Sequence, residues 1–273
     1  MDGGSRGRRA VARVSDPVRG AYHGGAQAWA ADASLAYVPL ARHLVARLGG
    51  ELPGPRALDA GAGTGAAGDE LRRLGASVVS VDLEPDMLAH HLAERGPAVA
   101  ADVAQLPLRS GSVDVVASAF VLNHVPDAPA TLRELGRVTR PGGTILASVF
   151  GNERSAAKEA VDETFLRFGW TPPDWYAAVR ERAETIGTPE ALAAAARRAG
   201  LADVEVWCEP VDVGLDTPEL VVRYRLGLAH ARAFFERMDD DARSAFVREA
   251  AEAVAATREP FRPEVLELVA RVS

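Results

Sequence analysis

The stretch Leu58-Asp59-Ala60-Gly61-Ala62-Gly63-Thr64-Gly65 decides the fold of this chain. It begins in an apolar run, 56–60, that predicts a strand, and it leads into 65–74, which predicts a helix closed by Gly75. Glycines at alternate positions let the backbone turn sharply and let a ligand approach the main chain closely. In an open α/β sheet such a turn lies at the carboxyl ends of the strands, where ligands bind.

The same alternation of strand and helix continues on both sides of this turn. Apolar, β-branched runs predict strands at 56–60, 77–82, 98–101, 113–119, 144–150, 204–208 and 265–272, the last with a short helix as the competing interpretation. Helical spacing and stop signals predict helices at 35–48, 65–74, 84–94, 129–139 and 189–199. Strands alternating with helices indicate parallel βαβ units. We therefore expect an α/β fold with a Rossmann-like, doubly wound sheet of seven mostly parallel strands.

Three segments do not follow this alternation of strand and helix. Residues 152–187 and 210–262 read as helical and are rich in aromatic residues, so we expect two helical insertions that act as lids. Residues 1–31 are rich in Gly and Arg, and we expect a flexible N-terminal segment there. The remaining 32–273 then form one catalytic domain that carries both insertions.

Composition excludes several classes of protein. Hydrophobic residues make up 48% and charged residues 25% of the chain, as in ordinary globular proteins, and the formal charge is −7. The body of the chain shows no basic stripe, so we expect no nucleic-acid partner. No run approaches the ~18 apolar residues of a membrane span, and no apolar stretch follows the N-terminal arginines, so we expect no membrane partner and a cytoplasmic address. Cys208 is the only cysteine, which excludes an internal disulfide and a multi-cysteine metal site; we expect no metal.

Three acids follow successive strands of the predicted sheet. Asp59 ends the first strand, Asp82 the second and Asp102 the third. A carboxylate at Asp59 would repel a pyrophosphate but attract a ligand with an ammonium and a sulfonium. Asp82 can accept both ribose hydroxyls, a role that NAD and adenosylmethionine share, and Asp102 can accept a hydrogen bond from an adenine amino group. Together the acids favour adenosylmethionine, although 63–68 also satisfies the dinucleotide GxGxxG pattern.

At this point the sequence resembles the class I S-adenosylmethionine-dependent methyltransferases, within them the small-molecule group that includes ubiquinone and menaquinone biosynthesis enzymes. The resemblance rests on five motifs: LDAGAGTG at 58–65, VDLEPDML at 81–88, ADVAQLPLRSGSVDVV at 101–116, LNHVPD at 122–127 and RVTRPGG at 137–143. Thr139-Arg140-Pro141 stands where the family often has leucine-lysine-proline, a departure that touches a turn.

The resemblance implies a cofactor, S-adenosylmethionine, and a set of residues that bind it. Gly61 and Gly63 would border its methionine part, Asp82 would hold the ribose, and Leu83 and Met87 would pack against adenine. Asp102 and Val103 would contact the edge of adenine that carries the amino group, and Ser118 and Ala119 would close the pocket near the sulfonium. Tyr22 stands where many of these enzymes have a tyrosine that folds over the cofactor, with His23 in place of the usual aspartate; the competing interpretation is that Tyr22 anchors the segment to the core.

The sequence indicates fewer residues for the methyl acceptor than for the cofactor. An oxygen acceptor of high pKa needs a base, and His124, in the loop after the fourth strand, is the best candidate by position; otherwise it shapes the pocket. An apolar substrate pocket could be lined by a set of aromatic residues and one histidine: Trp170, Trp175, Tyr176, Tyr224 and His230.

We therefore expect a methyltransferase for a small-molecule acceptor, on oxygen or nitrogen, in secondary metabolism. An enzyme that binds adenosylmethionine but catalyses another reaction, such as a cyclisation, is the alternative. A non-catalytic ligand-binding subunit is a further reading. An NAD-dependent oxidoreductase is disfavoured by Asp59 and Asp102. The sequence leaves the oligomeric state open.

Overall fold

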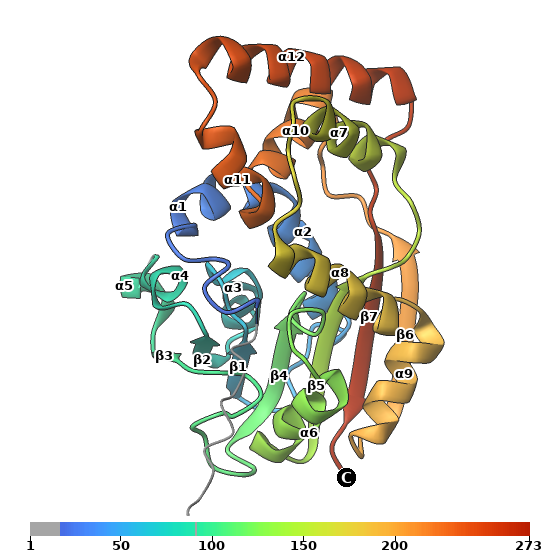
Figure 1. Cartoon of the computed structure of the whole chain (residues 1–273). Helices are drawn as coiled ribbons and strands as arrows, with labels where there is room; N and C mark the ends of the chain where they lie inside the picture. Colours follow the sequence, from blue (N-terminus) through green and yellow to red (C-terminus); the bar gives the residue numbers. More distant parts are fainter. Residues whose placement is uncertain (1–16, 91) are drawn as a thin grey trace, which may run out of the picture.

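The computed structural model describes residues 17–90 and 92–273, and in this part of the chain a single seven-stranded sheet has the order β3-β2-β1-β4-β5-β7-β6 (Figure 1). The strands are β1 (Arg56–Ala60), β2 (Ser77–Asp82), β3 (Ala98–Ala100), β4 (Val113–Ala119), β5 (Thr139–Phe150), β6 (Ala202–Pro210) and β7 (Glu264–Arg271). Pairs among β1 to β5 are parallel. β7 runs antiparallel to both β5 and β6. The predicted doubly wound, mostly parallel sheet is confirmed, and its last segment is a strand rather than a short helix.

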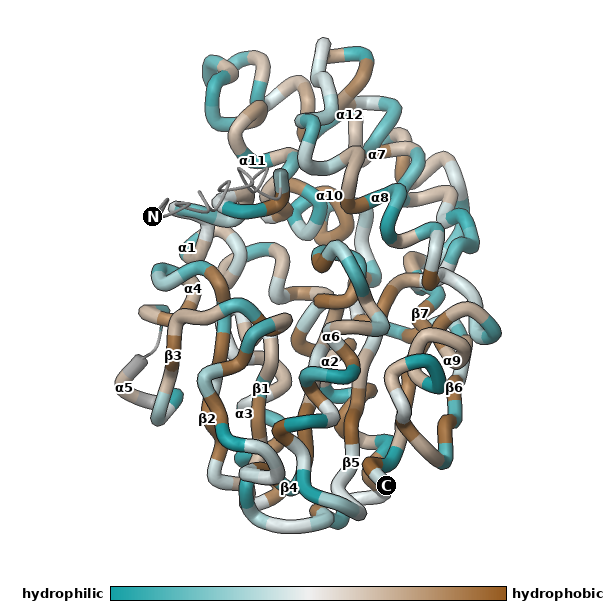
Figure 2. Tube along the Cα trace, turned by 60° about the horizontal axis from the view of Figure 1, so that its bottom comes forward, coloured by the Kyte–Doolittle hydropathy of each residue, from teal (hydrophilic) through white to brown (hydrophobic). Residues whose placement is uncertain are grey.

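Helices cover both faces of the sheet and one of its ends. They are α1 (Ala26–Ala28), the π-helix η1 (Trp29–Ala33), α2 (Ser34–Ala46), α3 (Ala66–Arg73), α4 (Pro85–Ala89), α5 (Leu92–Arg95), α6 (Ala128–Val138), α7 (Ala156–Arg167), α8 (Asp174–Ile186), α9 (Pro189–Arg198), α10 (Pro218–Leu226), α11 (Ala229–Glu236) and α12 (Asp240–Thr257). Leu44 of α2 and Leu71 of α3 pack on one face, and Leu135 of α6 and Leu192 of α9 pack on the other. Figure 2 shows the hydrophobic residues concentrated along the strands between these layers.

Two predicted segments differ from the structure. The helix expected over 84–94 is two short helices, α4 and α5, because His90 adopts an extended conformation with φ −65° and ψ 121°. Residues 26–31, expected to be irregular, are helical and lead through η1 into α2. The rest of the predicted N-terminal segment forms turns over 17–24, and 1–16 lie outside the described residues.

The two insertions build a helical cap over the carboxyl ends of β4 and β5. We call α7, α10, α11 and α12 the cap; Figure 1 shows them gathered at the top, beyond the sheet. Phe165 of α7 and Phe246 of α12 are fully buried with their ring centroids 4.5 Å apart. Phe120 and Phe150, which follow or end β4 and β5, pack against the same cluster. The cap is therefore anchored to the strand ends where a ligand would bind.

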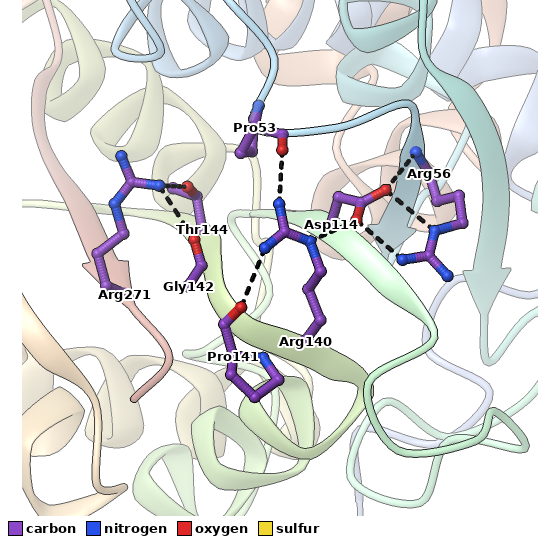
Figure 3. Close-up of polar contacts among 8 residues, drawn as sticks. All are labelled: Pro53, Arg56, Asp114, Arg140, Pro141, Gly142, Thr144 and Arg271. Carbon is purple, nitrogen blue, oxygen red and sulfur yellow. Dashed lines mark hydrogen bonds and ion pairs between the residues drawn. The ribbon is translucent and has the colours of Figure 1, made fainter.

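The opposite end of the sheet is closed by a charged network around Asp114 of β4 (Figure 3). The Asp114 carboxylate accepts hydrogen bonds from the Arg56 side chain at 2.9 and 3.0 Å and from Arg140 Nε at 2.6 Å. Arg140 also donates to the Pro53 carbonyl at 2.6 Å. These guanidinium groups hold the pKa of Asp114 well below its usual range. Arg140, the departure from the family pattern, thus links three segments on the side away from the glycine turn.

Candidate functional site

A single cavity collects most of the residues that the sequence predicts for the cofactor. It lies at the carboxyl ends of β1, β2 and β4. The predicted residues that line it are Tyr22, Asp59, Gly61, Gly63, Asp82, Leu83, Met87, Asp102, Val103, Ala119 and His124. Ser118 does not line it, because its side chain is fully buried within β4.

The glycine turn curls against the loop after β4. The amides of Gly61 and Ala62 donate to the Val81 carbonyl at 2.8 and 2.9 Å, which ties the turn to β2. Gly61 has φ +73°, and a Cβ there would lie 2.3 Å from Cγ2 of Val121. Gly61 is therefore required for packing against Val121, in addition to any close approach by a ligand. A Cβ at Gly63 would meet only the Met87 methyl, at 3.6 Å.

Asp59 lies at the base of the cavity. Its Oδ2 accepts a hydrogen bond from the Gly68 amide at 2.9 Å, at the start of α3, and the residue is only 1% exposed. Burial raises the pKa of Asp59 to about 7, although the Gly68 amide and the charge of Arg95 oppose this shift. A cationic group of a ligand would favour the ionised form of this carboxyl.

Asp82 joins the glycine turn to the loop after β2. Its Oδ2 accepts from the Gly63 amide at 2.7 Å, and its Oδ1 accepts from the Glu84 amide at 2.9 Å. Burial raises the pKa of Asp82, and these two amides act in the opposite direction. A carboxylate that is fixed by backbone amides is preorganised to accept further hydrogen bonds from a pair of hydroxyls.

Asp102 forms the third acidic corner of the cavity. Its Oδ1 accepts from the Ala104 amide at 2.9 Å, and its Oδ2 lies 3.5 Å from an Arg19 guanidinium nitrogen. Val103 beside it is buried, and so is Met87, so the acids alternate with apolar surface. The structure thus brings the three predicted acids together around one cavity.

The N-terminal residues 17–24 lie across this cavity, and we call them the strap. The Gly20 amide donates to Glu84 at 2.9 Å, and the Gly24 amide donates to Asp86 at 2.6 Å. On its other side, Arg232 of α11 donates to the Gly24 carbonyl at 2.6 Å. The strap is therefore fastened both to the loop after β2 and to the cap.

Tyr22 and His124 meet where the strap crosses the loop after β4. The Tyr22 hydroxyl and His124 Nε2 are 2.9 Å apart, at hydrogen-bond distance. Burial raises the pKa of Tyr22 well above its usual value, so this phenol stays protonated. The loop of His124 is held from α8, because Arg182 donates to the His124 carbonyl at 2.8 Å. Trp175 of α8 packs beside Tyr22, with ring centroids 6.0 Å apart.

The five residues predicted to bind the acceptor do not line the cofactor cavity. Trp170 donates through Nε1 to the His230 carbonyl at 3.1 Å, and the Tyr176 ring stacks on His230 with centroids 3.9 Å apart. Burial lowers the pKa of His230 well below its usual value. Tyr224 is 3% exposed within the cap cluster. Trp170, Trp175 and His230 instead line a second cavity on the other side of the strap.

Sequence reasoning missed an aromatic group and one arginine. Trp29, Tyr37 and Phe120 line the cofactor cavity, with centroids 4.7 Å apart for Trp29–Tyr37 and 5.2 Å for Tyr37–Phe120. Trp29 and Tyr37 are eight positions apart, which places them on one face of a helix, but the first lies in a glycine-rich segment. Arg95 is buried behind the turn and donates to the Gly63 carbonyl at 2.8 Å. No local pattern marks Arg95, because its partner is 32 residues away.

Comparisons with known proteins agree with this geometry. Residues 58–147 match the family model described as "Methyltransferase domain". The demethylmenaquinone methyltransferase of Mycolicibacterium gilvum is 34% identical over 160 residues, which cover 56% of this chain and 70% of that protein. The chain belongs to the class I S-adenosylmethionine-dependent methyltransferases. Its cofactor is S-adenosylmethionine.

Other known proteins match over smaller shares of their length or at lower identity. The demethylmenaquinone methyltransferase of Mycolicibacterium paratuberculosis is 40% identical over 114 residues, 42% of this chain, and the match spans half of that protein. Phosphoethanolamine N-methyltransferase 2 of Haemonchus contortus, in complex with S-adenosyl-L-methionine, is 21% identical with a TM-score of 0.55 and covers 85% of this chain and 52% of that chain. A SAM-dependent methyltransferase of Archaeoglobus fulgidus is 15% identical with a TM-score of 0.51. The match covers 86% of this chain and 94% of that chain. These two structures show the shared fold.

The residues of the first cavity fit this cofactor. The Asp59 carboxylate would suit an ammonium group, and the Asp82 carboxylate would suit a pair of ribose hydroxyls. Leu83, Met87 and Val103 provide apolar surface for a planar base. In residues 17–90 and 92–273, no helix is long and apolar enough to span a bilayer.

Proposed function

We propose that this protein transfers the methyl group of S-adenosylmethionine to an oxygen or nitrogen of a small, largely apolar acceptor. The Tyr22–His124 contact supports the proposal, because His124 lines the cofactor cavity and its imidazole is of the type that acts as a base. Trp29, Tyr37 and Phe120 give the same cavity an aromatic wall. An apolar ring is the acceptor that such a wall would bind best.

Bound S-adenosylmethionine supplies a methyl group on a positively charged sulfur, which is already activated for displacement. The chain's residues must then align the acceptor and handle its proton. Because Tyr22 stays protonated, its hydroxyl can donate to His124 Nε2 when no acceptor is bound. An acceptor hydroxyl beside this pair can pass its proton to Nε2 directly or through the Tyr22 hydroxyl. Methyl transfer would then break the carbon–sulfur bond, leave its electron pair on sulfur and leave the acceptor's proton on His124 Nε2.

Water must be kept away from the reacting groups, and the strap and α8 are placed for that role. The strap crosses the cavity through Tyr22, and α8 contributes Trp175 beside it and Arg182 to the His124 loop. The names of the relatives, demethylmenaquinone methyltransferases, support a quinone-like ring as acceptor. A role in secondary metabolism and a cytoplasmic address remain our predictions.

The proposal is tested with labelled S-adenosylmethionine and extracts of the source organism. We expect label transfer to a small organic-soluble product. His124→Ala and Tyr22→Phe should lower turnover at least tenfold while S-adenosylhomocysteine affinity stays within twofold. His43→Ala is the matched control, because His43 forms a hydrogen bond with Glu267 and lines neither cavity.

Two outcomes would count against the proposal. Cofactor binding without label transfer would favour a non-methylating reaction such as a cyclisation, or a non-catalytic ligand-binding role. Unchanged turnover in His124→Ala would mean that the acceptor is methylated by positioning alone, without a base.

A further inference from the structure

A second cavity, of about 710 Å³, adjoins the cofactor cavity across the strap. It lies between the strap, the turn before α8, and α11. Arg19 lines both cavities. Trp175 lines the second cavity and packs beside Tyr22, which lines the first. The two cavities are thus separated by little more than the strap.

The charge of this second cavity is opposite to that of the chain. Arg19, Arg232 and Arg237 line it together with His23 and His230, and no Asp or Glu of the described residues lines it. The whole chain carries a formal charge of −7. Arg19 lies 3.5 Å from Asp102 and Arg232 lies 3.9 Å from Glu236, so within the described part of the chain Arg237 is the guanidinium of this wall whose charge is not paired. With no lining carboxylate, Arg237 gives the hollow a local positive potential that attracts anions.

Two buried nitrogen atoms of the wall lack hydrogen-bond partners. Nε of Arg232 and Nε2 of His230 are both buried without a partner among the described residues. The other nitrogens of Arg232 are fixed, because they donate to the carbonyls of Gly24 at 2.6 Å and His23 at 3.3 Å. A buried N–H without an acceptor costs stability, so the Nε–H of Arg232 leaves this wall with a donor to which an oxyanion is the complementary acceptor.

Four aromatic residues also line the second cavity. Trp170 and Trp175 line it from the turn before α8 and from α8 itself, and Phe168 and Phe234 line it from the end of α7 and from α11. Arg237 is exposed, and its guanidinium makes no hydrogen bond or ion pair within 17–90 and 92–273. Aromatic surface next to a free guanidinium group suits a ligand with a planar apolar body and an anionic end.

The geometry points to an acceptor with such an anionic end, a carboxylate or a phosphate, which binds in the arginine-lined cavity. Its apolar body would extend past Trp175 toward Tyr22 and His124. This inference rests on the proposed function, since it assigns the occupant as the methyl acceptor. It narrows that function, because an uncharged quinone would leave the guanidinium of Arg237 without a partner.

Calorimetry on the full chain tests the inference without turnover. The probes are 2-naphthoate, 2-naphthyl phosphate and the neutral 2-naphthamide. We expect the better of the two anions to bind at least tenfold more tightly than the amide, and its identity distinguishes a carboxylate end from a phosphate end. Arg237→Gln should weaken that anion roughly tenfold, the usual effect of losing a hydrogen bond to a charged group. Arg248→Gln, on the exposed surface of α12, is the matched control and should leave all three affinities unchanged.

Further measurements separate this inference from the proposed function. Saturating S-adenosylhomocysteine should leave the anion's affinity unchanged, because the two ligands occupy different cavities; competition between them would overturn the assignment. Equal binding of anions and amide, or an Arg237→Gln variant that behaves as wild type, would also overturn it. Loss of methyl transfer with anion preference intact would instead refute only the proposed function.

Discussion

The affinity of the protein for its cofactor should depend on the protonation of Asp59. Burial raises the pKa of this carboxyl to about 7, so near neutral pH it is only partly ionised in the ligand-free protein. An ammonium group of the cofactor beside Asp59 favours the ionised form. Binding must therefore release a proton, and affinity must fall as pH falls through 7.

The magnitude follows from the titration curve of one group. With a pKa of about 7, the ionised fraction is about 0.76 at pH 7.5 and about 0.09 at pH 6, so affinity should fall roughly eightfold between them. At pH 6.5 each bound ligand should release about 0.8 of a proton. The raised pKa also means that the folded, ligand-free protein holds more protons than the unfolded chain between about pH 4 and 7. Its contribution to stability is greatest below pH 4 and declines as pH rises to 7.

Titration calorimetry with S-adenosylhomocysteine, in two buffers of different ionisation enthalpy, measures both quantities. Asp59→Asn should remove the pH dependence between pH 6 and 7.5, because an amide can still accept the Gly68 hydrogen bond but cannot titrate. Asp69→Asn, at an exposed carboxyl paired with Arg72, is the control and should keep the wild-type slope. Equal affinity of the wild type at pH 6 and 7.5, or the same slope in Asp59→Asn, would refute this reasoning.

Three further predictions follow from other contacts. Gly61→Ala should destabilise the fold by about 1–3 kcal/mol in urea unfolding, since its Cβ would lie 2.3 Å from Val121 at a φ of +73°, and Val121→Ala should recover part of this loss. Gly63 also has a positive φ, +50°, but a Cβ there would meet only Met87 at 3.6 Å, so an equal loss in Gly63→Ala would contradict a role for the Val121 contact. Asp114→Asn should cost about 1.5–3 kcal/mol at neutral pH. Because the folded pKa of Asp114 is lowered, that difference should shrink below about pH 4, and a pH-independent difference would refute it. Hydrogen exchange over 152–187 should slow on adding S-adenosylhomocysteine with acceptor, because a lid is more mobile before its ligand binds. Unchanged exchange throughout this segment would refute its role as a lid.

The strands could be predicted because their signal is local. β1, β2 and β4 match the predicted bounds, since each is a short apolar run that ends at a turn or an acid. The three acids could be placed together for the same reason: carboxyl ends of parallel strands meet at one edge. The break between α4 and α5 could not be predicted, because it depends on the extended backbone of His90 rather than on a glycine or proline there.

The parts of the site that depend on packing between distant segments were harder to predict. Gly61 was expected to make room for a ligand, and the structure adds Val121, 60 positions away, as a reason. Trp170 and Tyr224 were both expected in the acceptor pocket; Trp170 lines the second cavity, whereas Tyr224 is buried in the cap cluster and lines neither cavity. Composition marks aromatic residues as candidates, but only the tertiary structure shows which of them reach a cavity.

The central claim is that the first cavity binds an adenosyl cofactor through Asp82. Calorimetry with S-adenosylhomocysteine and NADH, on the wild type and Asp82→Ala, tests it most directly. We expect one-site binding of S-adenosylhomocysteine, weakened by roughly 1.5–3 kcal/mol in Asp82→Ala, and no comparable affinity for NADH. Tight binding of NADH without binding of S-adenosylhomocysteine would contradict it.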